Sequence, residues 1–188
     1  MRALANAAEL EEYTYLVAGC VGEFWTRICF AHLKNFGDLR EGEMSSLGKR
    51  YGQGLQLINI LRDLGDDLRQ GRCYLPADEL GSLGLTPAEI LGDPGRVEPI
   101  LKKWREKAQD AIAAGVEYAA TIRSRRVRFA TALPALIGAR TLALLREAGA
   151  SAMTRRVKVS RSEVRKIIVS AALASPGSLR HSFEKLLV

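Results

Sequence analysis

The segment Gly52–Asp67 reads GQGLQLINILRDLGDD, and it decides the fold expected of this 188-residue chain. Because successive residues of an α-helix are separated by about 100°, five polar side chains here fall within one narrow arc. Leucines and isoleucines fill the other directions, and the polar set consists of Gln56, Asn59, Asp63, Asp67 and Gln70. The pattern predicts a largely buried helix that carries one polar stripe.

The two aspartates of this stripe are difficult to explain as purely structural residues. Asp63 and Asp67 stand four residues apart, so their like charges destabilise a helix by roughly 0.2–0.5 kcal/mol. They also lie near the helix C-terminus, where the helix dipole disfavours anions. A hard cation removes both difficulties, because Mg²⁺ binds carboxylate and amide oxygens and completes its shell with substrate phosphates. The stripe therefore predicts a Mg²⁺–diphosphate site at Asn59, Asp63 and Asp67. The alternative is a pair of surface charges neutralised by arginines elsewhere.

Asp66 lies outside the stripe. It follows Arg62 by four residues and precedes Arg69 by three, which is the usual spacing of ion pairs on an exposed helical face. We expect Asp66 to be structural.

The rest of the chain is also helical in pattern. Aromatic residues make up only 6% of the chain, while Ala, Leu, Arg and Glu, which favour helices, are abundant. Residues 73–76 should be extended before a proline, and Thr86–Glu89 fits a capping box for one short helix. No strand is convincing, so we expect a single all-α domain over residues 1–188. Its long helices are predicted at Ala3–Lys34, Ser45 or Ser46 to Arg69, Val97–Ser124, Phe129–Glu147, Ser160–Leu173 and Leu179–Leu187.

Charge is concentrated at the C-terminal end. The formal net charge is +7, and residues 150–188 hold eight Lys or Arg against Glu163 and Glu184, which gives +6. Such a segment could contact ligand phosphates, an anionic membrane or a nucleic acid, or be an ordinary solvated surface. No helix-turn-helix pattern or set of stacking aromatics supports a nucleic-acid partner.

Cysteines and apolar runs indicate the compartment. The three cysteines (Cys20, Cys29 and Cys73) form no disulfide framework, and the two isolated histidines offer no metal pair. The acidic start at Glu9, Glu11 and Glu12 does not fit a signal peptide. The apolar runs 13–22 and 130–137 are too short to span a bilayer. We expect a cytoplasmic protein, at most peripheral to a membrane.

Two stretches of this sequence together resemble the signatures of the squalene/phytoene synthase family. The first is Gln56-x-x-Asn59-Ile60-x-Arg62-Asp63-x-x-x-Asp67, followed by Arg72-x-Tyr74-x-Pro76. The second, upstream, is Tyr13-x-x-x-Val17-Ala18-Gly19-x-Val21-Gly22. The resemblance implies the all-helical isoprenoid synthase fold. It also implies a Mg²⁺-dependent prenyltransferase that joins two prenyl diphosphates (farnesyl or geranylgeranyl) head to head to a squalene- or phytoene-like product.

The same resemblance assigns roles to individual residues. It implies that Asn59, Asp63 and Asp67 hold Mg²⁺ on one diphosphate, and that Gln56 and Arg62 contact the diphosphate or line its pocket. Tyr13 would assist cation formation and proton handling. Arg72, Tyr74 and Pro76 would form a flap over the diphosphate, or else a loop that Tyr74 tethers to the core. Three basic residues would meet a second diphosphate, or NADPH in a squalene-forming enzyme: Arg155, Arg156 and Lys158.

The reacting carbocation requires a dry apolar cavity. We expect Val17, Phe24 and Leu55 to line it. Ala18, Gly19 and Gly22 are small, so they should allow close approach of a ligand tail or of another helix.

The family's first aspartate-rich motif, DxxxD, has no counterpart before Tyr13. We therefore expect the N-terminal part of the fold to be absent, and the chain alone to have little activity because half of a two-sided Mg²⁺ clamp is poorly preorganised. An apolar face should be exposed, favouring an N-terminal partner chain or self-association. The alternative is a non-catalytic helical subunit or pseudoenzyme that binds prenyl diphosphate or a partner.

Overall fold

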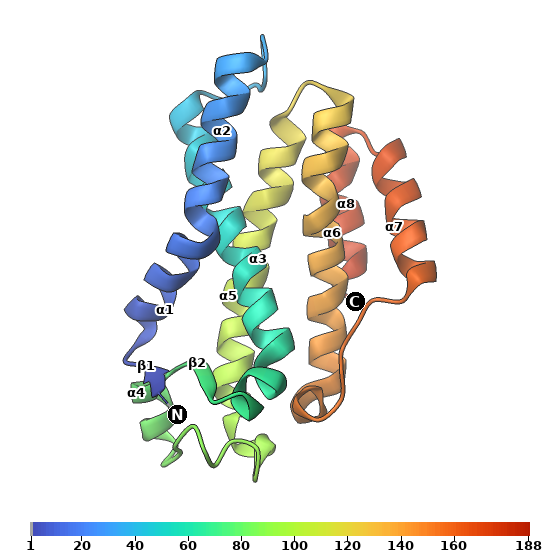
Figure 1. The fold of residues 1–188 in the computed structure, drawn as a ribbon. Coiled ribbons are helices and arrows are strands. Elements are labelled where there is room, and N and C mark those ends of the chain that lie inside the picture. The colour runs from blue at the N-terminus through green and yellow to red at the C-terminus, as the bar shows by residue number, and fades with distance from the viewer. Residues whose placement is uncertain (1) are drawn as a thin grey trace.

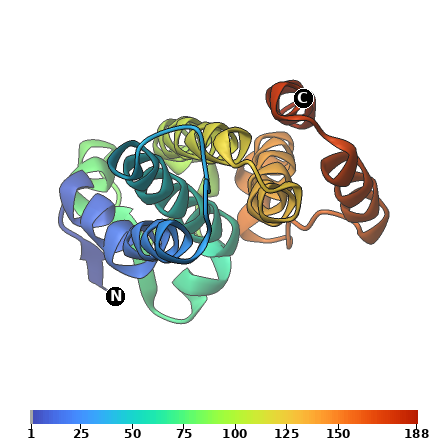
Figure 2. The same cartoon turned by 90° about the horizontal axis from the view of Figure 1, so that it is seen from above.

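A row of long helices forms the body of the protein. The computed structural model describes residues 2–188, and Figures 1 and 2 show α1–α2 on one flank and α7–α8 on the other, with α3, α5 and α6 between them. The elements in chain order are β1 (Arg2–Leu4), α1 (Ala7–Thr14), a π-helical turn (Tyr15–Gly19), α2 (Cys20–His32), α3 (Glu41–Arg69), β2 (Arg72–Pro76), α4 (Ala77–Ser82), a 3₁₀ turn (Pro94–Val97), α5 (Glu98–Thr121), α6 (Arg125–Ala148), a second 3₁₀ turn (Gly149–Met153), α7 (Arg161–Leu173) and α8 (Pro176–Leu186).

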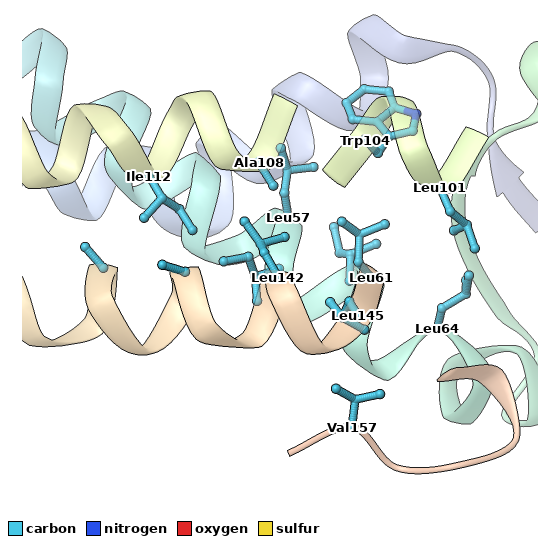
Figure 3. Close-up of a cluster of buried hydrophobic side chains, with 14 of the residues drawn as sticks. Leu57, Leu61, Leu64, Leu101, Trp104, Ala108, Ile112, Leu142, Leu145 and Val157 are labelled. Atoms are coloured by element: carbon cyan, nitrogen blue, oxygen red, sulfur yellow. The ribbon is translucent and has the colours of Figure 1, made fainter. Parts of the chain in front are cut away.

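The core lies between α3, α5 and α6 (Figure 3). Leu64 of α3, Trp104 of α5 and Leu142 of α6 are almost completely buried, and Val157, from the segment that precedes α7, lies on the side of this cluster opposite Trp104. Burying each such side chain contributes about 1.5–3 kcal/mol. The predicted central helix is therefore confirmed as the helix around which the others pack.

α2 lies unusually close to α3. A Cβ atom placed on Gly22 would stand 2.0 Å from the carbonyl oxygen of Gly48, and one on Gly52 would stand 2.2 Å from that of Ala18. These positions accept only hydrogen because the two backbones touch there. Of the small residues predicted to allow close approach, Gly22 thus serves helix packing, and Ala18 and Gly22 also line an apolar pocket.

The helix predicted over Ala3–Lys34 contains a discontinuity. Its α-helical part begins at Ala7, and the π-helical turn at Tyr15–Gly19 inserts one residue into the helical repeat. This insertion rotates everything after it by about 100° relative to an uninterrupted helix. The prediction that Phe24 lines an internal cavity is wrong for this reason: its side chain is 62% exposed.

Short strands were missed by the sequence prediction. β1 pairs in parallel with β2, with Arg2 opposite Arg72 and Leu4 opposite Pro76. The segment expected to be merely extended at 73–76 is therefore part of a two-stranded sheet that ties the N-terminus to the end of α3.

Several helix ends differ from the predicted ones. α3 begins at Glu41 and not at Ser45 or Ser46, and the Glu43 carboxylate caps this end by accepting from the backbone N–H and the Nε of Arg40, both at 3.1 Å. α8 begins at Pro176, capped by Ser175. The Thr86 backbone N–H and hydroxyl donate to Glu89 Oε2 at 2.8 and 2.6 Å, which is one half of the predicted capping box, but only turns follow. The helix in this region is α4, at Ala77–Ser82.

Within residues 2–188, one segment is long and apolar enough to cross a membrane by length and composition, namely Arg125–Met153. It comprises α6 and the turn after it. α6 packs against α3, α5, α7 and α8, as a core helix does. Its Arg140 binds Glu147 and Glu163.

Candidate active site

The polar stripe occupies the last four turns of α3. Leu57, Leu61 and Leu64 on the same helix are buried, whereas Asn59 is exposed and Asp63 is 46% exposed at its side chain. Asp67 is covered further, to 14% exposure. The predicted combination of a buried helix with a polar face is therefore present, and its two carboxylates have different environments.

Asp63 is bound by its sequence neighbour. Arg62 Nε donates to Asp63 Oδ1 at 2.8 Å, and Arg62 Nη2 donates to Oδ2 at 2.5 Å. This bidentate hydrogen bonding to Asp63 raises the pKa of the Arg62 guanidinium, so the arginine stays cationic. Gln56 lies two turns before Asp63 on α3 and is half-buried.

A cavity of about 190 Å³ adjoins this pair, and it brings together residues far apart in sequence. Arg62, Asp63, Asp66 and Arg69 of α3 form one wall, and Met153 and Arg155–Arg156 contribute to the opposite wall. Gly65 allows this approach because a Cβ there would stand 2.1 Å from the Met153 carbonyl oxygen. Arg155 and Arg156 thus share a cavity with Arg62 and Asp63, whereas Lys158 is exposed and absent from the cavity wall.

Asp66 behaves as a structural residue. Arg69 Nη1 donates to Asp66 Oδ1 at 2.8 Å, and Arg69 Nη2 donates to the Met153 carbonyl oxygen at 2.6 Å. Arg69 therefore fastens the turn after α6 to α3. The sequence indicated the Asp66 pair by its spacing, but nothing local to Arg69 indicated its second contact, 84 residues away.

Asp67 belongs to a second cluster, at the junction of α1, α3 and β2. Arg72 Nε donates to Asp67 Oδ1 at 3.0 Å, and Arg72 Nη2 donates to Gln70 Oε1 at 2.7 Å. Beside them the rings of Tyr13 and Tyr74 stack, with centroids 4.9 Å apart. Burial, Tyr74 and then Asp67 raise the pKa of Tyr13 to about 12. Tyr13 is consequently a neutral hydroxyl at physiological pH, able to donate or accept a hydrogen bond.

An apolar pocket of about 460 Å³ lies further towards the N-terminus of α3. Val17 and Leu55, both predicted to line such a cavity, do so, together with Trp25, Tyr51, Tyr118 and Pro134. Sequence reasoning missed the last four. Tyr51 of α3 and Tyr118 of α5 each fit the apolar pattern of their own helix. Their hydrogen-bond partners lie on other helices: Tyr51 donates to the Thr131 carbonyl, and Tyr118 pairs with the Thr26 hydroxyl.

The donor set fits a hard cation. Asn59, Asp63 and Asp67 offer only oxygen atoms, which suit Mg²⁺ and not zinc. Within residues 2–188, no three side chains of His, Cys, Asp or Glu gather into a metal-binding group. A cation here would therefore rely on two carboxylates and an amide, with substrate phosphates completing its shell.

Comparisons with known proteins identify the family. The sequence matches the family model described as squalene/phytoene synthase over residues 2–163. Phytoene synthase of Mycobacterium tuberculosis is 33% identical over 172 residues, covering 89% of this chain and 54% of that protein. Phytoene synthase of Thermus thermophilus is 40% identical over 96 residues, covering 51% of this chain and 29% of that protein.

Solved structures agree on the fold. TcSQS in complex with the ligand BPH1237 matches with a TM-score of 0.84 at 21% identity, covering 100% of this chain and 55% of that chain. A dehydrosqualene synthase in complex with a ligand matches with a TM-score of 0.72 at 25% identity, covering 91% of this chain and 58% of that chain. The expected all-α isoprenoid synthase fold is confirmed, and the chain spans about half of the length of these relatives.

Proposed function

Because the chain belongs to the squalene/phytoene synthase family, we propose that it supplies one diphosphate-binding side of a Mg²⁺-dependent synthase. The whole enzyme would join two prenyl diphosphates, farnesyl or geranylgeranyl, head to head. The observation that carries this proposal is the position of both halves of a substrate site on α3: arginine-bound carboxylates near its C-terminus and an apolar pocket towards its middle. Leu55 and Asp63 are separated by about 12 Å along the helix axis, a span suited to a substrate with a charged head and a long apolar tail.

The head of the substrate is bound by charge. Mg²⁺ held by Asn59, Asp63 and Asp67 would neutralise the diphosphate as it leaves. Arg62 and Arg72 donate two hydrogen bonds each within the site, and can turn their guanidinium groups from the carboxylates to phosphate oxygens. Tyr13 and Tyr74 present stacked rings beside Asp67, which can stabilise a nearby cation.

The apolar tail of the substrate would bind in the apolar pocket, from which it displaces water. Apolar walls around Val17, Leu55 and Pro134 offer a carbocation no strong nucleophile. Arg155 and Arg156 on the far wall of the smaller cavity are the candidates for contact with a second diphosphate or with NADPH.

A partner surface accompanies this site. Leu16, Val21, Phe24 and Trp25 are 45–62% exposed along one side of the π-helical turn and α2, which we call the open face. Such a contiguous apolar surface is suited to covering by further helices, on an N-terminal partner chain or through self-association. The isolated chain should then turn over substrate poorly, because the opposing half of the clamp is needed for preorganisation.

A second candidate is a non-catalytic subunit that binds prenyl diphosphate or a partner. The pairing of both Asp63 and Asp67 with arginines of this chain favours it, since such pairs neutralise the carboxylates without a metal. Mg²⁺-dependent ligand binding distinguishes the two candidates.

The two-part site is tested by comparing inorganic diphosphate with a non-hydrolysable farnesyl thiodiphosphate in equilibrium binding. Ala130→Trp adds bulk at the exposed rim of the apolar pocket and should weaken binding of the farnesyl compound while leaving inorganic diphosphate unchanged. Arg72→Gln should weaken both. Equal affinity of the wild-type chain for the two ligands would exclude the proposed role of the pocket.

A further inference from the structure

The C-terminal segment that contains α7 and α8 carries most of the protein's net charge. Eight Lys or Arg lie between Arg155 and Lys185 against two acids, a side-chain charge of +6 out of +7. Both acids are already paired: Glu163 with Arg140 at 2.8 Å, and Glu184 with Arg180 at 3.2 Å. The remaining cations of this region therefore have no carboxylate partner among the described residues.

A small cleft between α7 and α8 collects part of this charge. It measures about 250 Å³, with Lys166, His181 and Lys185 at its walls together with the hydroxyls of Ser170 and Ser182. Its apolar walls include Ile167 of α7. Cations and hydroxyl donors without a carboxylate are the groups that bind a phosphate.

The outer side of α7 also exposes apolar residues. Ile167 and Ala171 are buried against the bundle, whereas Val169 and Leu173 point away from it and are 59% and 77% exposed. Along the helix, the cations come first, at Arg161, Arg165 and Lys166, and the exposed apolar residues come last. A surface helix with cations beside exposed aliphatic side chains has the chemistry of an interfacial membrane helix.

We propose that the α7–α8 surface docks on a bilayer that contains anionic phospholipids. The apolar end of α7 enters the acyl boundary, the cations contact lipid phosphates, and the cleft takes one phosphate headgroup. A second copy of the chain is a poor occupant, because a symmetric contact would oppose like charges. RNA is also a poor occupant, because the aromatic residue of these two helices, Phe183, is buried and Leu173 would stay in water.

This surface is distinct from the open face. Figure 2 places α7 at the opposite end of the row of helices from α2. The open face carries exposed apolar side chains from Leu16 to Trp25 but no comparable set of cations. Adsorption through it would depend little on lipid charge.

The proposal is tested by co-sedimentation of the 188-residue chain with phosphatidylcholine vesicles, with and without phosphatidylserine. The wild-type chain should bind only the anionic vesicles. Lys166→Gln/Lys185→Gln should weaken partitioning on the order of 30-fold, since each basic residue near such a surface contributes about a factor of five. Leu173→Ser should weaken it by roughly tenfold.

The matched control removes the same charge elsewhere. Lys102 on α5 and Arg126 on α6 are exposed and make no ion pair among the described residues, so Lys102→Gln/Arg126→Gln should bind as the wild type does. Equal loss in this control would show that net charge alone is responsible and would overturn the proposal. So would binding to neutral vesicles, loss of binding on Phe24→Ser alone, or binding to single-stranded RNA without binding to vesicles.

Discussion

Gly22→Ala should separate two helices that now touch. The new Cβ would stand 2.0 Å from Gly48 O, while ordinary contact begins at 3.4 Å, so the gap must widen by roughly 1.4 Å (3.4 − 2.0). Both atoms nearest to the new Cβ belong to backbone, and no side chain can turn aside. Overpacking of this kind costs about 1–3 kcal/mol or more, partly offset by about 1 kcal/mol of helix propensity. Because an overlap of this size with backbone falls at the upper end of that range, we expect a net loss of about 2 kcal/mol.

Gly42→Ala is the matched control on α3. A Cβ there meets nothing within 4 Å, so only the propensity gain of about 0.5–1 kcal/mol applies. Urea unfolding followed by far-ultraviolet circular dichroism measures both variants. The two substitutions should change stability in opposite directions. A Gly22→Ala chain as stable as the Gly42→Ala chain would refute the close backbone contact between α2 and α3.

Three further predictions concern stability and activity. Glu98→Gln should lower the free energy of unfolding by about 1–3 kcal/mol, because buried Arg105 loses its carboxylate partner; thermal unfolding measures this. Burial raises the pKa of Tyr118 to about 12. The stability that the neutral Tyr118 hydroxyl contributes is therefore present below pH about 10 and is lost as the pH rises to about 12. Tyr118→Phe should reduce this loss of stability in unfolding curves measured at alkaline pH, and an unchanged pH dependence would contradict the prediction. Isolated chain incubated with farnesyl diphosphate and Mg²⁺ should give little product, and robust turnover would show that no further helices are needed.

The sequence predicted the helices well where one periodicity continued uninterrupted. α5, α6 and α7 each follow a 3.6-residue pattern and appear within a few residues of their expected ends. The first helix shows how the same reasoning fails. Extending the phase of Tyr13 to Phe24 assumed a continuous α-helix, and the inserted residue of the π-helical turn rotated Phe24 outwards.

Non-local contacts account for the other differences. β1 is three residues long and forms only because residues about 70 positions later lie beside it, so its own sequence gives no strand pattern. At Thr86–Glu89 the Glu89 carboxylate accepts from the Thr86 N–H, as in a capping box, but no helix follows. Gly92 and Pro94 follow too closely for the helix to gain enough hydrogen bonds to offset its nucleation.

The sequence indicated which residues belong to the candidate site, but not which of them form ion pairs with one another. The spacing of Asp63 and Asp67 on one helical face indicated that they act together, and both do lie on the polar side of α3. That each is held by a different arginine, Arg62 or Arg72, depends on how α3 meets β2 and on side-chain reach. The approach of Arg155 likewise required the fold of the turn after α6.

The most direct test of the central claim is titration calorimetry of the chain with farnesyl thiodiphosphate, with and without Mg²⁺. Three chains are compared: wild type, Asp63→Asn/Asp67→Asn, and Asp66→Asn as the control that removes one nearby carboxylate outside the stripe. Mg²⁺-dependent binding should persist in Asp66→Asn and disappear in the double variant. Binding by the wild type that is unaffected by Mg²⁺, or that survives loss of both Asp63 and Asp67, would contradict the claim.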